Sequence, residues 1–420
     1  MSKLSDGDRG ELAVKIRAAF KPATPINSHE LFSGRQTQSA ALVSAVNQNG
    51  QHAILFGERG VGKTSLANVL FFLLECPGWP KMTPHVNCTR KDTYGTLWSR
   101  VFMEIRDTSE RVKLEVPRRA VKQLRLAQEG ITEAATMDVV RSTLTAIGEL
   151  ALVVVIIDEF DTIEDPDVKA GVADTLKYLS DRNSPCTVIV IGVADDVDDL
   201  IADHQSVERC LAQVRMPRMS RDELEGLVTK CLSRVEMTIE SVANQEISRI
   251  SKGLPHYAHL LGLHSALAAV ERGSLSVTSK HVQTALKAAI EFAHQSIQQA
   301  YFRATESSQR TAKYREVLLA CAMAETSDLG FFAPSDVRSP LTRILKKQAK
   351  IEAFSRHLHA FCEEESGPVL KRITVRGRPQ FRFVNTLMQP FVVIKGLADR
   401  IITEEDLKAT RDQSEQGRFF

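Results

Sequence analysis

The stretch "GERGVGKTS", Gly57 to Ser65, decides the fold of this chain. Its spacing is a glycine, four further residues, and then Gly-Lys-Thr. The apolar run His52–Phe56 before it is typical of a buried strand, and Ser65–Phe72 after it has no Gly or Pro and is typical of a helix. Strand, glycine-rich loop and helix, in that order, form the context of a phosphate-binding loop, or P-loop. The segment therefore predicts an α/β nucleotide-binding domain.

The chemistry of this loop follows from its residue types. Glycines let backbone N–H groups curl round phosphate oxygens, and the helix N-terminus adds partial positive charge. Lys63 is expected to neutralise the β- and γ-phosphates of ATP, and the Thr64 hydroxyl to bind Mg²⁺. The predicted phosphate-binding residues are Gly57, Glu58, Arg59, Gly60, Val61, Gly62, Lys63, Thr64 and Ser65.

A second decisive stretch is "LALVVVIIDEFD", Leu150 to Asp161. Its β-branched residues without alternation are typical of a central parallel strand covered on both faces. The acidic residues that follow lie where α/β sheets bind ligands, at the carboxyl end of the strand. We expect Asp158 to hold Mg²⁺ and Glu159 to polarise the attacking water. The sequence therefore predicts both halves of an ATP hydrolysis site.

Two further catalytic candidates follow a third apolar strand, Thr187–Gly192. Asp195 at the tip of this strand could contact the attacking water and so sense the γ-phosphate. Arg209 is expected on a helix just before another strand, Ala212–Met216, where it could reach the phosphate of a neighbouring subunit. An ordinary surface arginine is the alternative for Arg209.

Composition limits the class of protein. The 420 residues are 43% hydrophobic and 25% charged, as in ordinary globular proteins. The net charge of +2 means that nucleic-acid binding would need a local basic patch. One candidate is Val112–Gly130, rich in Lys and Arg, which could equally be a solvated helix face. The seven scattered cysteines, the polar N-terminus and the lack of a long apolar run predict a cytoplasmic protein.

Taken in order, these features resemble an AAA+ ATPase of the initiator-like clade, which includes origin-recognition and replication-initiation ATPases. Phe32–Arg35 and the following Gln36–Leu42 resemble the segment that packs on adenine. "ISKGLPHYAHLLG", Ile250 to Gly262, resembles the lid helix that carries a second sensor. The resemblance covers about residues 29–290 and implies ATP, Mg²⁺ and self-association through the nucleotide.

Two residues depart from that clade's pattern. Asp195 stands where the clade usually has Asn, and His256 stands where Arg is expected in the lid helix. An acid facing the γ-phosphate is electrostatically unfavourable, and imidazole carries less charge than guanidinium and reaches less far. His256 is accordingly expected to contact the nucleotide weakly, and hydrolysis is expected to be slow. His256, His259 and His264 could also be simple polar positions of the lid helix.

The C-terminal third predicts a winged helix-turn-helix. Ile351, Phe354, Leu358 and Phe361 form one apolar helical stripe, and Lys350, Arg356 and His357 are expected to face outward. The following "VLKRITVRGRPQFRFVN" alternates with period two on both sides of Arg376–Pro379, which predicts a β-hairpin with a basic tip. Tentative DNA contacts are Arg356, Arg372, Arg376 and Arg378. Docking of a protein is the alternative use of such a module.

The predicted fold is a parallel-sheet AAA+ domain followed by a helical lid and a winged helix. The expected parts are an N-terminal extension (1–28), the AAA+ domain (29–217), the lid (218–290), a helical linker (291–313), the winged helix (314–400) and a charged tail (401–420). A long helical stretch is expected over Lys280–Tyr301.

Three functions remain open from the sequence. The first is a slow ATPase switch that assembles on duplex DNA. The second is a signalling or defence switch similar to the STAND ATPases, whose winged helix docks an effector protein. The third is an ATPase that targets DNA transposition.

Overall fold

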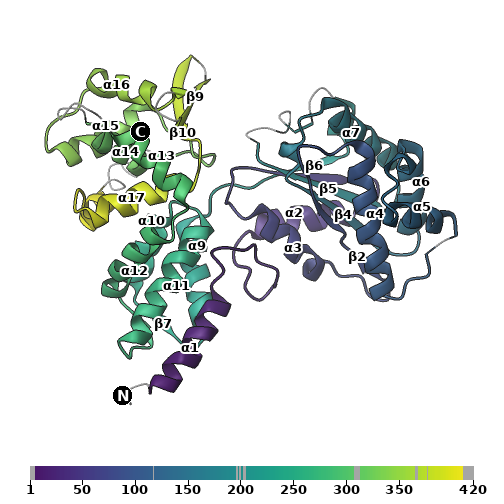
Figure 1. Cartoon of the computed structure of the whole chain (residues 1–420), viewed down its shortest axis with the longest axis horizontal. Helices are drawn as coiled ribbons and strands as arrows, with labels where there is room; N and C mark the ends of the chain where they lie inside the picture. Colours follow the sequence, from purple (N-terminus) through teal and green to yellow (C-terminus); the bar gives the residue numbers. More distant parts are fainter. Residues whose placement is uncertain are drawn as a thin grey trace. The chain divides into compact units, whose positions relative to one another are not determined.

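The computed structural model describes residues 5–116, 118–194, 197, 200–201, 205–306, 313–364, 368–375 and 377–409. The chain folds into two compact units (Figure 1). The P-loop unit comprises Pro25–Glu58 and Gly62–Met216. The C-terminal unit comprises Met1–Thr24, Arg59–Val61 and Pro217–Phe420.

A parallel sheet of six strands forms the centre of the P-loop unit. Its strands are β1 (His52–Phe56), β2 (Lys81–Met82), β3 (His85–Asn87), β4 (Leu152–Asp158), β5 (Cys186–Gly192) and β6 (Leu211–Arg215). The order across the sheet is β2-β4-β5-β1-β6, and β3 pairs with β4 beyond the end of β2. The P-loop strand β1 therefore lies between β5 and β6, and Asn87 of β3 pairs in register with Asp158 of β4.

Three of the predicted strands agree with the structure within one residue. The strand before the P-loop has the predicted bounds, β5 begins one residue earlier than expected, and β6 lies one residue earlier. Every residue of β1 and β5 is buried, as is β4 beyond its first residue. Uninterrupted apolar runs are what a sheet covered on both faces requires.

Helices surround this sheet. They are α2 (Gln36–Val46), α3 (Lys63–Leu73), α4 (Tyr94–Arg111), α5 (Arg118–Gln128), α6 (Met137–Gly148), α7 (Pro166–Asp181) and α8 (Gln205–Glu208). Helix α2 packs on β1 and β6, whereas α6 packs on β4 and β5. The three helices α4, α5 and α6 all lie between β3 and β4 in the chain, and α5 packs against both of its neighbours.

The C-terminal unit is largely helical. Its helices are α1 (Asp6–Ala19), α9 (Arg221–Ser233), α10 (Ser241–Ser251), α11 (Pro255–Glu271), α12 (Ser279–Glu291), α13 (Gln295–Thr305), α14 (Tyr314–Met323), α15 (Pro334–Leu345), α16 (Ile351–Ala360) and α17 (Met388–Ala398). Two short strand pairs complete it: β7 (Thr238–Ile239) with β8 (Ser276–Val277), and β9 (Leu370–Val375) with β10 (Arg378–Phe383). No helix in the described part of the chain is long and apolar enough to span a membrane.

Three expectations about the C-terminal unit need comment. The hairpin is present as β9 and β10, paired antiparallel from Leu370–Phe383 to Val375–Arg378. The helical stretch expected over Lys280–Tyr301 is present with one break, because α12 ends at Glu291 and α13 begins at Gln295. The outward orientation of His357 is wrong: the side chain is buried, with its ring edge-on to Tyr314 at a centroid distance of 4.7 Å.

Candidate nucleotide site

The P-loop has the backbone conformation that its glycines permit. Gly57, Gly60 and Gly62 have φ of 146°, 84° and 98°, which disfavour a side chain. A Cβ at Gly57 would lie 2.5 Å from the carbonyl oxygen of Met216, so this position has no room for one. Helix α3 begins directly after Gly62, with Lys63 as its first residue. The loop and the helix N-terminus thus form the cradle that an anionic phosphate needs.

Lys63 lies inside this cradle. Its side chain is 8% exposed, and Nζ donates hydrogen bonds to the carbonyl oxygens of Gly57 and Glu58, at 2.9 and 2.8 Å. In these two contacts the ammonium group is held by neutral carbonyl oxygens. It can therefore exchange them for the stronger charge-assisted bonds of a phosphate.

Thr64 and Asp158 meet at the carboxyl edge of the sheet. The Thr64 hydroxyl donates to Oδ2 of Asp158 at 2.8 Å, and Nε2 of His85 lies 3.4 Å from the same oxygen. Burial of Asp158 opposes its ionisation, but hydrogen bonds from His85, Thr64 and the Glu159 N–H outweigh this effect and hold the pKa of the carboxyl below its ordinary value. Asp158 is therefore a carboxylate at neutral pH.

This donor set fits a magnesium ion. A hydroxyl and an ionised carboxylate in mutual contact are hard oxygen ligands, and Mg²⁺ takes few protein ligands together with water and substrate phosphates. Thr64 and Asp158 would hold the ion beside the phosphate cradle. The ion would supply charge neutralisation there.

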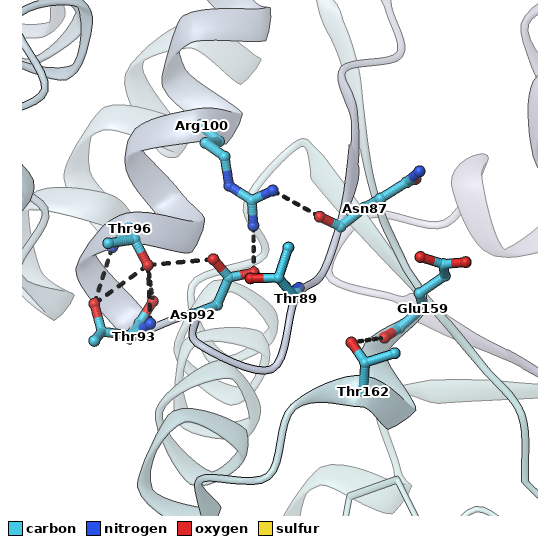
Figure 2. A network of polar contacts seen from close by, with 8 residues as sticks. All are labelled: Asn87, Thr89, Asp92, Thr93, Thr96, Arg100, Glu159 and Thr162. Carbon is cyan, nitrogen blue, oxygen red and sulfur yellow. Dashed lines mark hydrogen bonds and ion pairs between the residues drawn. The ribbon is translucent and has the colours of Figure 1, made fainter.

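Glu159 has a different environment from Asp158. It has φ of 56° and an exposed side chain, and its carboxylate makes no hydrogen bond to any described residue. Its backbone is fixed, because the Thr162 hydroxyl donates to the Glu159 carbonyl at 2.7 Å. In Figure 2 the carboxylate extends toward the side chain of Asn87. The carboxylate can therefore reach a water molecule, but no described residue holds it in one orientation.

Polar residues next to this edge were missed from the sequence. Arg100 of α4 donates to the Asn87 carbonyl at 2.7 Å and pairs with buried Asp92, so it fixes the end of β3 beside β4 (Figure 2). Asp161 accepts a hydrogen bond from the Val193 N–H at 2.7 Å and so holds the end of β5. Only Asp161 carried a detectable signal, because it follows the end of β4 by three residues, whereas Arg100 lies within α4.

The remaining catalytic candidates lie apart from the P-loop contacts. Asp195 falls outside the described residues. Arg209 follows α8 rather than lying within it; it is exposed and forms an ion pair with Asp181. An exposed arginine with an exposed partner can exchange that partner at low cost.

His256 contacts the N-terminal segment of its own unit. Its Nδ1 donates to the Pro22 carbonyl at 2.7 Å, and burial lowers the pKa of the imidazole. His259, one turn later on α11, accepts from the Lys21 N–H at 3.4 Å and packs edge-on against Phe20. The two lid histidines therefore anchor the chain just after α1, and the nucleotide contact of His256 stays a prediction.

The flanks of the P-loop have their own contacts. The Ser65 hydroxyl accepts a hydrogen bond from the Ile26 N–H at 3.0 Å. The loop tip, Arg59–Val61, groups with the C-terminal unit, in which the Thr386 hydroxyl donates to the Arg59 carbonyl at 2.7 Å.

The candidate DNA contacts are solvent-exposed. Arg356 lies on α16, Arg372 on β9 and Arg378 on β10, and all three side chains are exposed. Arg372 also contacts Nδ1 of His359 at 3.5 Å. Arg376 falls outside the described residues.

Known structures share this architecture. The Walker-type ATPase PABY2304 of Pyrococcus abyssi matches with a TM-score of 0.51 and 15% identity, over 88% of this chain and 98% of that chain. The ORC2 protein of Aeropyrum pernix matches with a TM-score of 0.49 and 14% identity, over 94% of this chain and 98% of that chain. The Aeropyrum pernix ORC1 protein in complex with DNA matches with a TM-score of 0.43 and 15% identity, over 93% of this chain and 98% of that chain. At these identities the likeness concerns the fold alone.

The expected P-loop ATPase fold is thereby confirmed, and the Pyrococcus protein, whose TM-score exceeds 0.5, carries that conclusion. No curated protein sequence matches the chain. The family model described as novel STAND NTPase 1 matches residues 19–326, which is more than half of the chain and includes the whole P-loop unit with the lid helices. The chain therefore belongs to the novel STAND NTPase 1 family.

Proposed function

We propose that this protein is a slow ATPase that works as a nucleotide-controlled switch, with the assembly of another macromolecule as its output. The observation that carries the proposal is the Thr64–Asp158 hydrogen bond of 2.8 Å, with Lys63 held in the adjacent loop. Triphosphate and metal ligands are thus positioned together before any ligand binds. Membership of an NTPase family supports the same chemistry.

Each residue has a definite task in this proposal. Lys63 releases the carbonyls of Gly57 and Glu58 and binds the β- and γ-phosphates. Thr64 and Asp158 hold Mg²⁺, which offsets phosphate charge. Glu159 orients the attacking water and takes up its proton.

Slow hydrolysis is supported by two placements. The Glu159 side chain is exposed and has no hydrogen bond from the described residues to fix it. His256, which would have to contact the γ-phosphate as a lid sensor, donates instead to Pro22 and has a lowered pKa. Neutral imidazole contributes little charge to phosphate.

Recruitment of a protein effector is the first candidate output of the switch, and the match to a STAND NTPase family supports it. The loop tip belongs to the C-terminal unit, where Thr386 holds Arg59, so a change of loop conformation on nucleotide binding would be felt there. Breaking this bond with Thr386→Val should speed nucleotide exchange. Ser335→Ala, a change of another hydroxyl of the same unit, is the control.

Assembly on duplex DNA is the second candidate. It is favoured by the exposure of Arg356, Arg372 and Arg378 on α16 and the hairpin. A phosphate contact by each arginine would make affinity fall linearly with the logarithm of salt concentration. Targeting of transposition would be a form of this second candidate.

One experiment separates the two. Glu159→Gln should trap the ATP state, and the mass in solution is then measured with ATP, with duplex DNA and with both. An ATP-dependent larger species that ignores DNA supports the effector switch, and one that needs both supports assembly on DNA. A monomer under every condition contradicts self-assembly through the nucleotide, including any role of Arg209 in a neighbouring site.

A further inference from the structure

Helix α5 lies at the outer edge of the P-loop unit, beside α4 and α6 (Figure 1). Its sequence, RRAVKQLRLAQ, contains four basic residues and no acidic one. The inward face is formed by Ala120, Leu124 and Ala127, all buried. These positions are spaced i, i+4 and i+7, so a single stripe of the helix attaches it to the core.

The outward face carries a second stripe with the same spacing. Arg118, Lys122 and Arg125 are all exposed and lie two positions before each inward residue, which places them on roughly the opposite side of the helix. They extend over about 10 Å of the helix axis. None of the three forms an ion pair or a side-chain hydrogen bond within the described part of the chain.

This arrangement does not serve the fold. Like charges one turn apart repel each other, and a cation in the first turn opposes the helix dipole. The first turn of α5 has no acidic residue that could offset Arg118. Glutamine at the three positions would keep helix propensity and remove the repulsion. The cations are therefore available for an external anionic partner.

The same face also contains a hollow with apolar lining. It has a volume of about 380 Å³ and is lined by Arg118, Val121, Lys122, Arg125, Leu126 and Glu129. Val121 and Leu126 are half-buried, so apolar side chains lie between the charged ones. Glu129 stands at the C-terminal end, which leaves the net positive charge at the N-terminal turns of the helix.

We propose that this face of α5 binds an acidic segment of a partner protein that also carries an apolar anchor side chain. The three cations match acidic side chains, and Val121 with Leu126 would accept the anchor. A phosphate backbone would use the cations but not the apolar lining. The net charge of +2 likewise gives the whole chain little attraction for a polyanion.

The surface deepens the proposed function by naming the chemistry of a partner. It rests on that function only for its regulation by ATP, since the stripe and hollow lie wholly within the P-loop unit. Binding to α5 and its dependence on nucleotide can therefore be measured separately.

The test uses fluorescence anisotropy with the full chain. The probe is a short fluorescein-labelled peptide of repeated Glu-Glu-Leu, and the variant is Arg118→Gln with Lys122→Gln and Arg125→Gln. The variant should bind the peptide about tenfold more weakly, and the difference should shrink at high salt. A matched control, Arg90→Gln with Lys91→Gln and Arg182→Gln, removes three exposed cations of the same unit elsewhere and should bind as the wild type does.

Two further probes define the occupant. A Gln-Gln-Leu peptide should lose affinity because the charges are gone, and a Glu-Glu-Ser peptide because the anchor is gone. Equal binding by the α5 variant and the wild type would overturn the proposal, as would undetectable binding of the Glu-Glu-Leu peptide. Tighter binding of a short labelled duplex DNA that depends on the same three residues would overturn it in favour of nucleic acid.

A separate arm tests the regulation. If ATP changes the peptide affinity of Glu159→Gln, the switch and the surface are linked. If ATP changes nothing while the α5 variant still binds weakly, the surface stands and its regulation by the proposed switch is contradicted.

Discussion

The carboxyl edge of the sheet and the lid helix α11 differ in how they hold their functional candidates. At the sheet edge Thr64 and Asp158 bond to each other, and Lys63 bonds to its own loop. On α11 His256 and His259 bond to the backbone of Lys21 and Pro22. The proposed phosphate and metal ligands therefore contact one another within one unit, whereas the proposed lid sensor is engaged in a structural contact.

The largest effect expected from this comparison concerns Glu159. Glu159→Gln should lower the rate of ATP hydrolysis by about 100-fold or more while leaving MgATP affinity unchanged, because the group orients water and does not hold phosphate. Phosphate release at saturating ATP measures it. Glu164→Gln, an exposed neighbouring carboxylate, is the control and should hydrolyse ATP normally. Equal loss in both variants would contradict the assignment.

The next effect concerns acid stability of the P-loop unit. His52 accepts from the Val188 N–H and donates to the Leu176 carbonyl, both at 3.0 Å, and burial lowers its pKa to about 4. Between pH 6.5 and 4 the His52 imidazole binds a proton in the unfolded chain but not in the folded unit. The free energy of unfolding therefore falls as the pH falls. From pH 6.5 to 5 this amounts to about 2 kcal/mol.

Tryptophan fluorescence isolates that effect. The chain has two tryptophans, Trp79 and Trp98, and both lie in the P-loop unit. Urea unfolding followed by their emission should show a steeper loss of stability with acid in the wild type than in His52→Gln. Parallel pH dependences in the two proteins would contradict a neutral His52.

A smaller effect separates metal binding from phosphate binding. Thr64→Val keeps the shape of the side chain and removes the hydroxyl that contacts Asp158. It should weaken MgATP binding about tenfold, because the metal ion loses one of its ligands. The binding of ATP in EDTA should hardly change, because the hydroxyl contributes only when the metal is present. Equal weakening with and without Mg²⁺ would place Thr64 on phosphate instead.

The smallest effect belongs to the lid. His256→Ala removes one hydrogen bond to Pro22 and should cost about 1 kcal/mol of stability, with ATP affinity within a factor of about three of the wild type. A large loss of ATP affinity with unchanged stability would show instead that His256 reaches the nucleotide. Arg209→Ala, which breaks an exposed ion pair, is the companion variant and should keep wild-type stability.

The sequence predicts the sheet edge well because its signals are local. An apolar run, a glycine loop and a helix start are contiguous, and the acidic residues of β4 directly follow their strand. The contacts of His85 and of Arg100 were not predictable, because each depends on the pairing of β3 with β4 and on the packing of α4. Neither element carries a signal for its partner.

The errors in the C-terminal unit have similar causes. His357 lies off the apolar stripe of its helix, yet Tyr314 of α14 covers it, which a single-helix pattern does not reveal. The break between α12 and α13 falls at Phe292–His294, where no Gly or Pro marks it. Val375, expected to alternate inward, is 40% exposed near the end of β9, where there is little core to cover it.

Calorimetric titration of MgATP into the wild type, Lys63→Ala and the control Lys91→Ala tests most directly that the P-loop and Asp158 clamp a triphosphate. Lys91 is an exposed lysine of the same unit. Lys63→Ala should weaken binding by about 100-fold or more, because charged hydrogen bonds to two phosphates are lost, and Lys91→Ala should match the wild type. A wild type without affinity for MgATP, or a Lys63→Ala variant that binds as tightly as the wild type, would contradict the clamp.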